Sequence, residues 1–162
     1  MNPRLPLPLP LAALGVLVLA GCGDPPREAD RRDSDTGRWY SVEQVMQGGA
    51  VFATHCAACH GPRAEGAEEW FRRLPDGRWP PPPLNGTAHA WHHPLWQLRQ
   101  QIREGSDPKH GDMPGFAELL SDAEIDAVIA WFQSFWLDEI YAAWLVYDAN
   151  FPESSSHQKG LE

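Results

Sequence analysis

The stretch THCAACHGP, residues 54–62, constrains this chain more than any other part of its sequence. It holds Cys56, Cys59 and His60 within five residues. Four kinds of chemistry use cysteines at this spacing: a structural disulfide, a zinc site, a redox-active dithiol and a covalent haem attachment. Each of them requires different surroundings, so the rest of the sequence distinguishes them.

Three of these chemistries fit the surroundings poorly. A structural zinc site needs four ligands, and the chain has only one further cysteine, Cys22, far from the motif, so zinc is the weaker alternative. A thioredoxin-like dithiol follows a strand, whereas the residues before the motif predict a helix. A disulfide across two residues would be strained and would leave His60 unexplained. The pattern therefore predicts that Cys56 and Cys59 bind a haem covalently and that His60 coordinates its iron.

Iron held by one histidine has a second axial position, and the sequence contains a methionine suited to it. Met113 lies 53 residues after His60, in the stretch GDMPGF. The glycines and the proline on either side indicate a rigid loop rather than a helix. A methionine in such a loop favours coordination of the haem iron. The alternative is that Met113 fills the core, which is the usual role of methionine.

The N-terminal segment predicts export and a lipid anchor. One positive charge, at Arg4, precedes an apolar run that is too short and too rich in proline to span a membrane, so residues 1–21 are expected to be a signal peptide. The run ends in LAGC, which resembles the lipobox of bacterial lipoproteins and implies lipidation of Cys22. The expected location is the bacterial cell envelope, facing the periplasm and tied to a membrane by lipid. An ordinary signal peptide that leaves Cys22 unmodified is the alternative.

Composition divides the rest of the chain into a tether, a domain and a tail. Residues 22–38 are charged and rich in proline, as expected of a flexible tether, and residues 148–162 are expected to form a loose polar tail. A single folded domain is expected at residues 39–147. Without residues 1–21 the chain has 12 basic and 22 acidic residues, a net charge of −10. This charge argues against nucleic acid as a partner and favours protein partners with a basic docking face.

The domain contains several helical signals and no convincing strand. Capping boxes at Ser41 and Ser121 predict the starts of two helices, and the first of these reaches His55, just before the cysteines. The stretch HPLWQLRQQIREG predicts another helix. The helix after Ser121 is expected to continue, with a bend near Leu137, through DEIYAAWLVY. The predicted fold class is all-α, with three to five helices wrapped around one covalently bound haem.

Most of the stretch from residue 41 to residue 135 resembles the class I cytochrome c family. GAVFATHCAACHG is similar to the family's first helix and haem attachment site, and VIAWF is similar to a segment of its last helix. The resemblance implies that Gly49 and Phe52 pack against the last helix, with Trp131 at the aromatic position. It also implies a small helical fold that carries one covalent haem c.

The stretch PPLNG, residues 82–86, resembles the segment of these cytochromes that lies beside the haem histidine. The resemblance implies that the Pro82 carbonyl accepts a hydrogen bond from His60 and that Leu84 packs on the haem ring. A carbonyl aimed at the far ring nitrogen would orient the histidine and strengthen it as a ligand. A polyproline spacer is the alternative role for the neighbouring prolines.

The chain departs from a minimal cytochrome in two places. The charged connection at residues 62–79 is longer than wrapping a haem requires, and the sequence does not indicate its role. The stretch TAHAWHHP places His89, His92 and His93 around Trp91. Trp91 and one or two of the histidines are expected to surround the haem and to donate hydrogen bonds to its propionates. A separate copper or zinc site is the alternative.

Together these features predict a membrane-tethered monohaem cytochrome that carries single electrons between periplasmic or membrane redox partners, and not an enzyme. No small-molecule substrate is evident from the sequence. Two other classes stay open. One is a haem enzyme or ligand sensor, in which the sixth position of the iron is open. The other is a copper-linked redox protein that uses the cluster of His89, His92 and His93.

Overall fold

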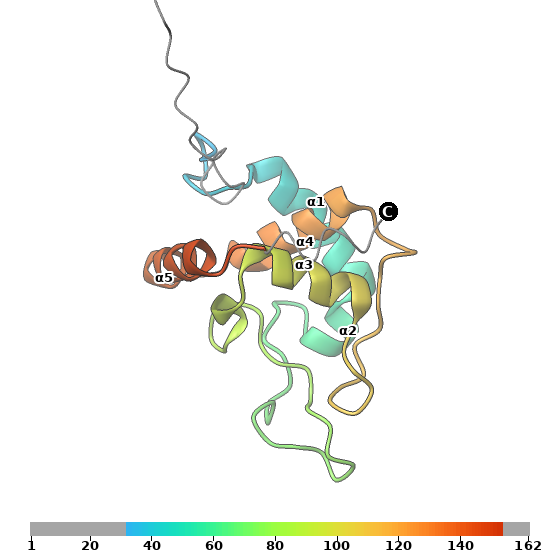
Figure 1. Ribbon diagram of the computed structural model, residues 1–162. Coiled ribbons are helices and arrows are strands. Elements are labelled where there is room, and N and C mark those ends of the chain that lie inside the picture. The colour runs from blue at the N-terminus through green and yellow to red at the C-terminus, as the bar shows by residue number, and fades with distance from the viewer. Residues whose placement is uncertain (1–31, 154–162) are drawn as a thin grey trace, which may run out of the picture.

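The structure is a computed structural model and describes residues 32–153. The described residues form five α-helices and a short 3₁₀ turn, with no strand (Figure 1). The expected all-α fold class is therefore confirmed. The predicted signal peptide and the predicted lipidation site at Cys22 lie outside the described residues. Within the described range, no helix is long and apolar enough to cross a membrane.

Two of the helices begin at the predicted capping boxes. Helix α1 (Val42–His55) follows Ser41, whose side chain accepts a hydrogen bond from the Gln44 backbone, while the Gln44 side chain accepts one from the Ser41 backbone. Helix α4 (Asp122–Gln133) follows Ser121 with the same reciprocal arrangement. Each box satisfies two of the N–H groups that the first turn of a helix leaves without a partner.

Three shorter elements connect α1 to α4. Helix α2 (Ala57–His60) is a single turn directly after α1. The 3₁₀ turn η2 (Ala90–His92) leads into α3 (Leu95–Glu104), which begins without a side-chain cap of its own. A residue far along the chain supplies that cap, because Asp148 accepts a hydrogen bond of 2.7 Å from the Leu95 backbone.

The last predicted helix is in fact two helices. Helix α4 ends at Gln133, and α5 (Asp138–Asn150) is a separate helix. Arg38 binds the junction: its guanidinium donates to the carbonyls of Gln133 and Trp136 at 3.0 and 2.9 Å and to the Asp138 carboxylate at 2.9 Å. A cation that binds the last carbonyls of a helix stabilises its end.

Residues on both sides of the predicted domain range of 39–147 contact the helices. Arg32 and Arg38 fall in the predicted tether; Arg32 donates to the Tyr141 hydroxyl at 3.2 Å, and Arg38 binds the end of α4. At the other end, the Phe151 carbonyl accepts a hydrogen bond of 2.9 Å from the Trp96 indole. The sequence did not predict these contacts, because single hydrogen bonds between distant segments leave no hydrophobic pattern.

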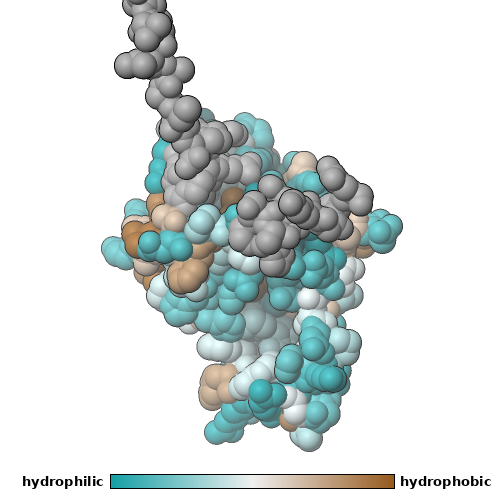
Figure 2. Space-filling model, viewed as in Figure 1, coloured by the Kyte–Doolittle hydropathy of each residue, from teal (hydrophilic) through white to brown (hydrophobic). Residues whose placement is uncertain are grey.

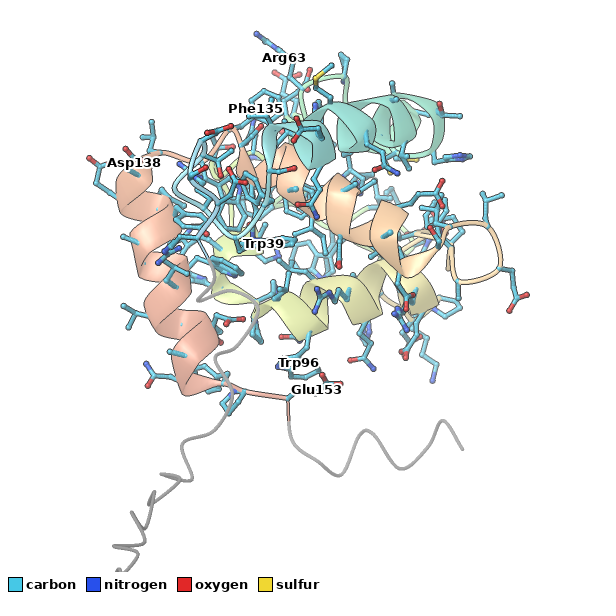
Figure 3. The ribbon with its side chains drawn as sticks, turned by 90° about the horizontal axis from the view of Figure 1, so that it is seen from above. Trp39, Arg63, Trp96, Phe135, Asp138 and Glu153 are labelled. Atoms are coloured by element: carbon cyan, nitrogen blue, oxygen red, sulfur yellow. The ribbon has the colours of Figure 1, made fainter. Side chains whose placement is uncertain are left out.

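The core depends on a close crossing of α1 and α4. A Cβ atom on Gly48 would lie 1.8 Å from the carbonyl oxygen of Ala127, so only glycine permits this approach. On the same side of α1, the rings of Phe52 and Trp131 have centroids 4.2 Å apart, and Gly49 lies against the Trp131 indole. The predicted packing of Gly49 and Phe52 on the later helix is therefore confirmed. Figure 3 shows α1, α4 and α3 in succession, with α5 along one side.

Gly48→Ala is expected to lower the free energy of unfolding by about 1–3 kcal/mol, the usual cost of overpacking a core, even though alanine is the better helix former. The added methyl group would collide with the Ala127 carbonyl and force α1 and α4 apart. Equilibrium unfolding in guanidinium chloride, followed by helical circular dichroism, measures the change. Gln47→Ala, at the exposed neighbouring position, is the control. Equal stability of the two variants would contradict the close crossing.

Candidate functional site

A cavity of about 800 Å³ lies among the helices and the loops that connect them. This volume is within the range of protein sites that bind cofactors and other small molecules. Helices α1, α3 and α4 supply apolar side chains to its wall: Phe52, Leu98, Ile102, Val128 and Phe132. The four residues predicted to hold the haem also line this one cavity, namely Cys56, Cys59, His60 and Met113. The fold therefore brings together residues that are far apart in the sequence.

The imidazole of His60 is held in one tautomer. The side chain is buried, and its Nδ1 lies 2.9 Å from the carbonyl oxygen of Pro82, which is the contact that the sequence predicts. Because a carbonyl only accepts, Nδ1 carries the proton and the lone pair remains on Nε2. Burial lowers the pKa of His60, and the hydrogen bond to Pro82 opposes this with a smaller effect. The ring is therefore neutral, as a metal ligand must be.

The backbone around Gly66 places the Pro82 carbonyl. Gly66 has φ +69°, and a Cβ atom there would lie 2.5 Å from the carbonyl carbon of Pro82. The Gly66 N–H donates to the His60 carbonyl at 2.7 Å, and the Leu84 N–H donates to the Ala64 carbonyl at 2.8 Å. Ala64 is buried with φ 55°, a conformation that costs a residue with a side chain about 1–2 kcal/mol. The close approach at Gly66 and the left-handed conformation of Ala64 thus hold the proline segment against His60.

The two cysteines lie beside each other at the cavity wall, and Cys56 lacks the property of a reactive redox thiol. The side chain of Cys56 is half-buried, and that of Cys59 is exposed. Burial, with a further effect from Cys59, raises the pKa of Cys56 to about 11. A reactive cysteine needs a lowered pKa, because the thiolate is the nucleophile. Burial that disfavours the thiolate is compatible with a neutral thioether, so this site fits a covalent haem.

The loop that carries Met113 is pinned to the end of α3. The Met113 N–H donates to the Ser106 hydroxyl at 3.0 Å, and the Met113 carbonyl accepts a hydrogen bond of 2.9 Å from the Ser106 backbone. Gly105 has φ +77°, and a Cβ atom there would lie 2.4 Å from the Met113 carbonyl oxygen. The Met113 sulfur lies 3.8 Å from the amide nitrogen of Gln101. The loop is therefore rigid at its base, as its glycines and proline indicate.

The predicted surroundings of the haem are only partly found at the cavity. Leu84 lines it, and the Leu84 carbonyl accepts a hydrogen bond of 2.8 Å from the Trp136 indole. Trp91, on the 3₁₀ turn η2, is not among the residues that line it. This residue is partly buried against the hydrophobic core, and its ring contacts that of His92, with centroids 3.7 Å apart. The predicted hydrogen bond from Trp91 to a haem propionate stays a prediction.

The histidine cluster is split by the same turn. His89 and His93 line the cavity with ring centroids 5.7 Å apart, whereas the ring of His92 lies near Tyr147. His110 also lines the cavity, from the loop before Met113. Among the described residues, no three His, Cys, Asp or Glu side chains are grouped closely enough to hold a metal ion. The separate copper or zinc site therefore has no support in this arrangement.

Several residues of the cavity wall were not predicted from the sequence as residues of the site. Trp70, Leu74 and Trp79 line it from the charged connection at residues 62–79. The signal was present, since these are apolar residues in an otherwise charged stretch. Gln101 is a further omission, and its position three residues after Leu98 on α3 could have indicated that it faces the cavity.

A family model described as cytochrome c oxidase, cbb3-type, subunit III matches residues 43–132 of this chain. The match spans more than half of the chain and extends from α1 to the end of α4. The chain therefore belongs to this family and is a c-type cytochrome. Its cofactor is covalently bound haem c, and it carries electrons. No solved structure matches the chain.

Gly66→Ala is expected to raise the midpoint potential of the haem and to lower the yield of haem-loaded protein. The new methyl group would displace the Pro82 backbone, so His60 would lose the hydrogen bond that makes it a stronger donor to ferric iron. Potentiometric titration measures the shift. Gly77→Ala is the matched control, because Gly77 also has positive φ but no atom lies within 4 Å of the added methyl. A potential unchanged relative to this control would contradict the role of Gly66.

Proposed function

We propose that this protein is a monohaem carrier of single electrons between periplasmic or membrane redox partners. In this proposal Cys56 and Cys59 form the thioethers to haem, and His60 and Met113 are the axial ligands. The haem supplies the redox chemistry through its ferric and ferrous states. The observation that carries the proposal is the 2.9 Å hydrogen bond between His60 and Pro82. It leaves the Nε2 lone pair available in a cavity that both cysteines and Met113 line.

The surroundings of Met113 favour a carrier over a haem enzyme or a ligand sensor. Two hydrogen bonds to Ser106 fix the backbone of Met113, and the amide of Gln101 lies beside its sulfur. A thioether fixed at the cavity wall can occupy the sixth position of the iron. A carrier gains from this closure, because an electron passes without anything binding to the metal, whereas an enzyme or sensor needs an open position.

The charge of the chain supports protein partners with a basic docking face. The chain has a net charge of −9, and the loss of residues 1–21 would make it −10. Complementary charge accelerates the encounter of transient redox partners. Because the matching family model is described as a subunit of a cytochrome c oxidase, we include the other subunits of such an oxidase among the proposed partners.

A lipid on Cys22 would hold the domain close to a membrane. The described part of the N-terminal segment begins at Arg32, which contacts Tyr141 of α5. Arg32 lies ten positions after Cys22 in the sequence, and a fully extended chain of that length spans at most about 35 Å. The proposed location is therefore the periplasmic face of a membrane in the bacterial cell envelope.

Met113→Ala tests the carrier function. The thioether favours ferrous iron, so its loss is expected to lower the midpoint potential by on the order of 0.1 V or more, within the range of about 0.8 V that axial ligands span. The oxidised protein should lose the weak red absorption band of an iron–thioether bond, and the reduced protein should bind carbon monoxide rapidly. Absorption spectra and potentiometric titration measure these changes.

Met46→Ala is the control for this experiment, because Met46 is exposed on α1 and does not line the cavity. Its spectrum and potential should equal those of the wild type. Rapid binding of carbon monoxide by the wild-type protein would contradict the proposed ligand and favour the enzyme or sensor. His110, which lines the cavity, would then be the ligand to test.

The second proposal concerns the anchor. Mass spectrometry of the mature protein is expected to find an acylated Cys22 at the N-terminus, and Cys22→Ser should move the protein from the membrane to the soluble fraction of cells. The visible spectrum of the variant should be unchanged, since the haem site lies elsewhere in the chain. An unmodified N-terminus at another residue would reject the lipid anchor and leave the cytochrome function intact.

A further inference from the structure

We propose that residues 62–79, here called the strap, hold the ligand loop (residues 106–113) closed over the haem. Arg78 and Trp79 are the positioning residues in this proposal, and they act on Met113. The inference rests on the proposed function, in which Met113 is the axial ligand. It assigns a role to the charged connection whose purpose the sequence does not indicate.

The base of the strap lies beside the axial histidine. At its base, the Gly66 N–H donates to the His60 carbonyl at 2.7 Å, and the Ala67 N–H donates to the Pro81 carbonyl at 2.9 Å. Its tip is a tight turn closed by two hydrogen bonds between backbone groups of residues 74–78, with Gly77 at φ +87°. The strap is thus a closed loop with an internally bonded tip. Figure 1 shows that the strap and the ligand loop extend from the same end of the helices.

One side of the strap faces the cavity. Trp70, Leu74 and Trp79 line the cavity wall, and the guanidinium of Arg73 lies over the Trp79 ring, 4.4 Å from its centroid. The ring of His89 lies against Trp70, with centroids 5.5 Å apart. The lower part of the surface in Figure 2, where the loops lie, is mostly hydrophilic. Leu74 and Trp79 keep exposed fractions of 39% and 42%, so they lie at the edge of the cavity, between its interior and the solvent. Apolar side chains at the edge of a cavity suit a segment that covers a large apolar cofactor.

The strap makes two contacts with the ligand loop. The Trp79 N–H donates to the His110 carbonyl at 2.8 Å, three residues before Met113. The Arg78 guanidinium pairs with the carboxylate of Asp112, the residue directly before Met113. Asp76 accepts a hydrogen bond of 2.9 Å from Arg78 Nε and so orients the guanidinium toward the loop. Both contacts therefore act on the segment that carries the sulfur.

These contacts oppose the release of Met113 from iron. The backbone of Met113 is itself bonded to Ser106, so a movement of the loop that withdraws the sulfur from the iron must break these bonds and displace the residues directly before Met113. That movement would break the bond between Trp79 and His110 and the ion pair of Arg78. An exposed ion pair contributes little by itself, so the backbone hydrogen bond is expected to carry the larger part.

Binding of imidazole to the oxidised, haem-loaded protein tests the strap. Imidazole can bind iron only after Met113 leaves, so the observed rate should saturate at high imidazole at the rate of loop opening. Trp79→Pro and Trp79→Ala both remove the indole, but only proline also removes the N–H donor. The saturating rate of Trp79→Pro is expected to exceed that of Trp79→Ala by about fivefold, the effect of one backbone hydrogen bond.

A second pair of variants separates the ion pair from general changes of charge. Arg78→Gln breaks the pair with Asp112, and its saturating rate is expected to rise by about two- to fivefold. Arg72→Gln is the matched control, because Arg72 pairs with Glu69 inside the strap, and its rate should equal that of the wild type. Arg78→Lys, which keeps the charge, should restore part of the slow rate. Global unfolding, followed by circular dichroism, should be the same for Arg78→Gln and Arg72→Gln.

The outcomes distinguish this inference from the proposed function. A faster rate in either comparison supports the strap. Equal rates in both comparisons, in a protein whose wild type shows saturation, overturn the strap and leave Met113 as the ligand. A wild-type rate that rises linearly with imidazole and never saturates shows that no internal ligand must leave, which overturns the ligation by Met113 and the strap together.

Discussion

The hydrogen bond from His60 to the Pro82 carbonyl is the interaction on which the rest of the site depends. It fixes the tautomer, because the proton on Nδ1 leaves the lone pair on Nε2. The bond exists only because Gly66 has no side chain, since a Cβ atom there would lie 2.5 Å from the Pro82 carbonyl carbon. Ala64, in a left-handed conformation, binds the backbone just after the prolines. Local strain near a functional group is retained where the surrounding structure holds it in place, and here it aligns a ligand.

The helices supply a frame that holds this arrangement still. The crossing of α1 and α4 at Gly48 fixes the position of α1 against α4. The cysteines follow directly after the last residue of α1 and so have a fixed position as well. Helix α5 lies beyond the residues that match the family model, yet it packs against η2 and binds the segment that leads into α3. Trp144 donates to the His93 carbonyl at 2.9 Å, and Asp148 caps the start of α3 at Leu95. A buried carboxylate at the N-terminus of a helix also interacts favourably with the helix dipole. Contacts between helices thus fix both the end of α1, which carries the cysteines, and α3, which precedes the loop of Met113.

The sequence predicted the structure best where a short local motif is typical of one kind of structure or site. The spacing of Cys56, Cys59 and His60 indicated the cofactor, and the capping boxes located the starts of α1 and α4, because both signals are local. Contacts between distant segments were harder to predict. The break between α4 and α5 depends on Arg38 from the predicted tether, and the cap of α3 comes from Asp148. The different neighbours of His89, His92 and His93 were unpredicted for a similar reason, since a 3₁₀ turn has a different periodicity from a helix or a strand. Side chains that bind backbone carbonyls across the fold leave no periodic pattern to read.

An electron carrier works best when its two axial ligands stay in place in both oxidation states, because then the electron passes without the breaking of a bond. In this protein one segment contacts the backbone on both sides of the site. At its base the strap binds the carbonyl of His60, and near its end Trp79 binds the carbonyl of His110 in the ligand loop. A movement of either proposed axial ligand, His60 or Met113, would therefore disturb the same segment. Apolar side chains of that segment line the cavity, so its displacement would also expose more of their surface to water at a cost in free energy. In the arrangement that we propose, a single length of chain maintains both the positions of the ligands and the burial of the cofactor, which gives a physical reason for a connection longer than haem binding alone requires.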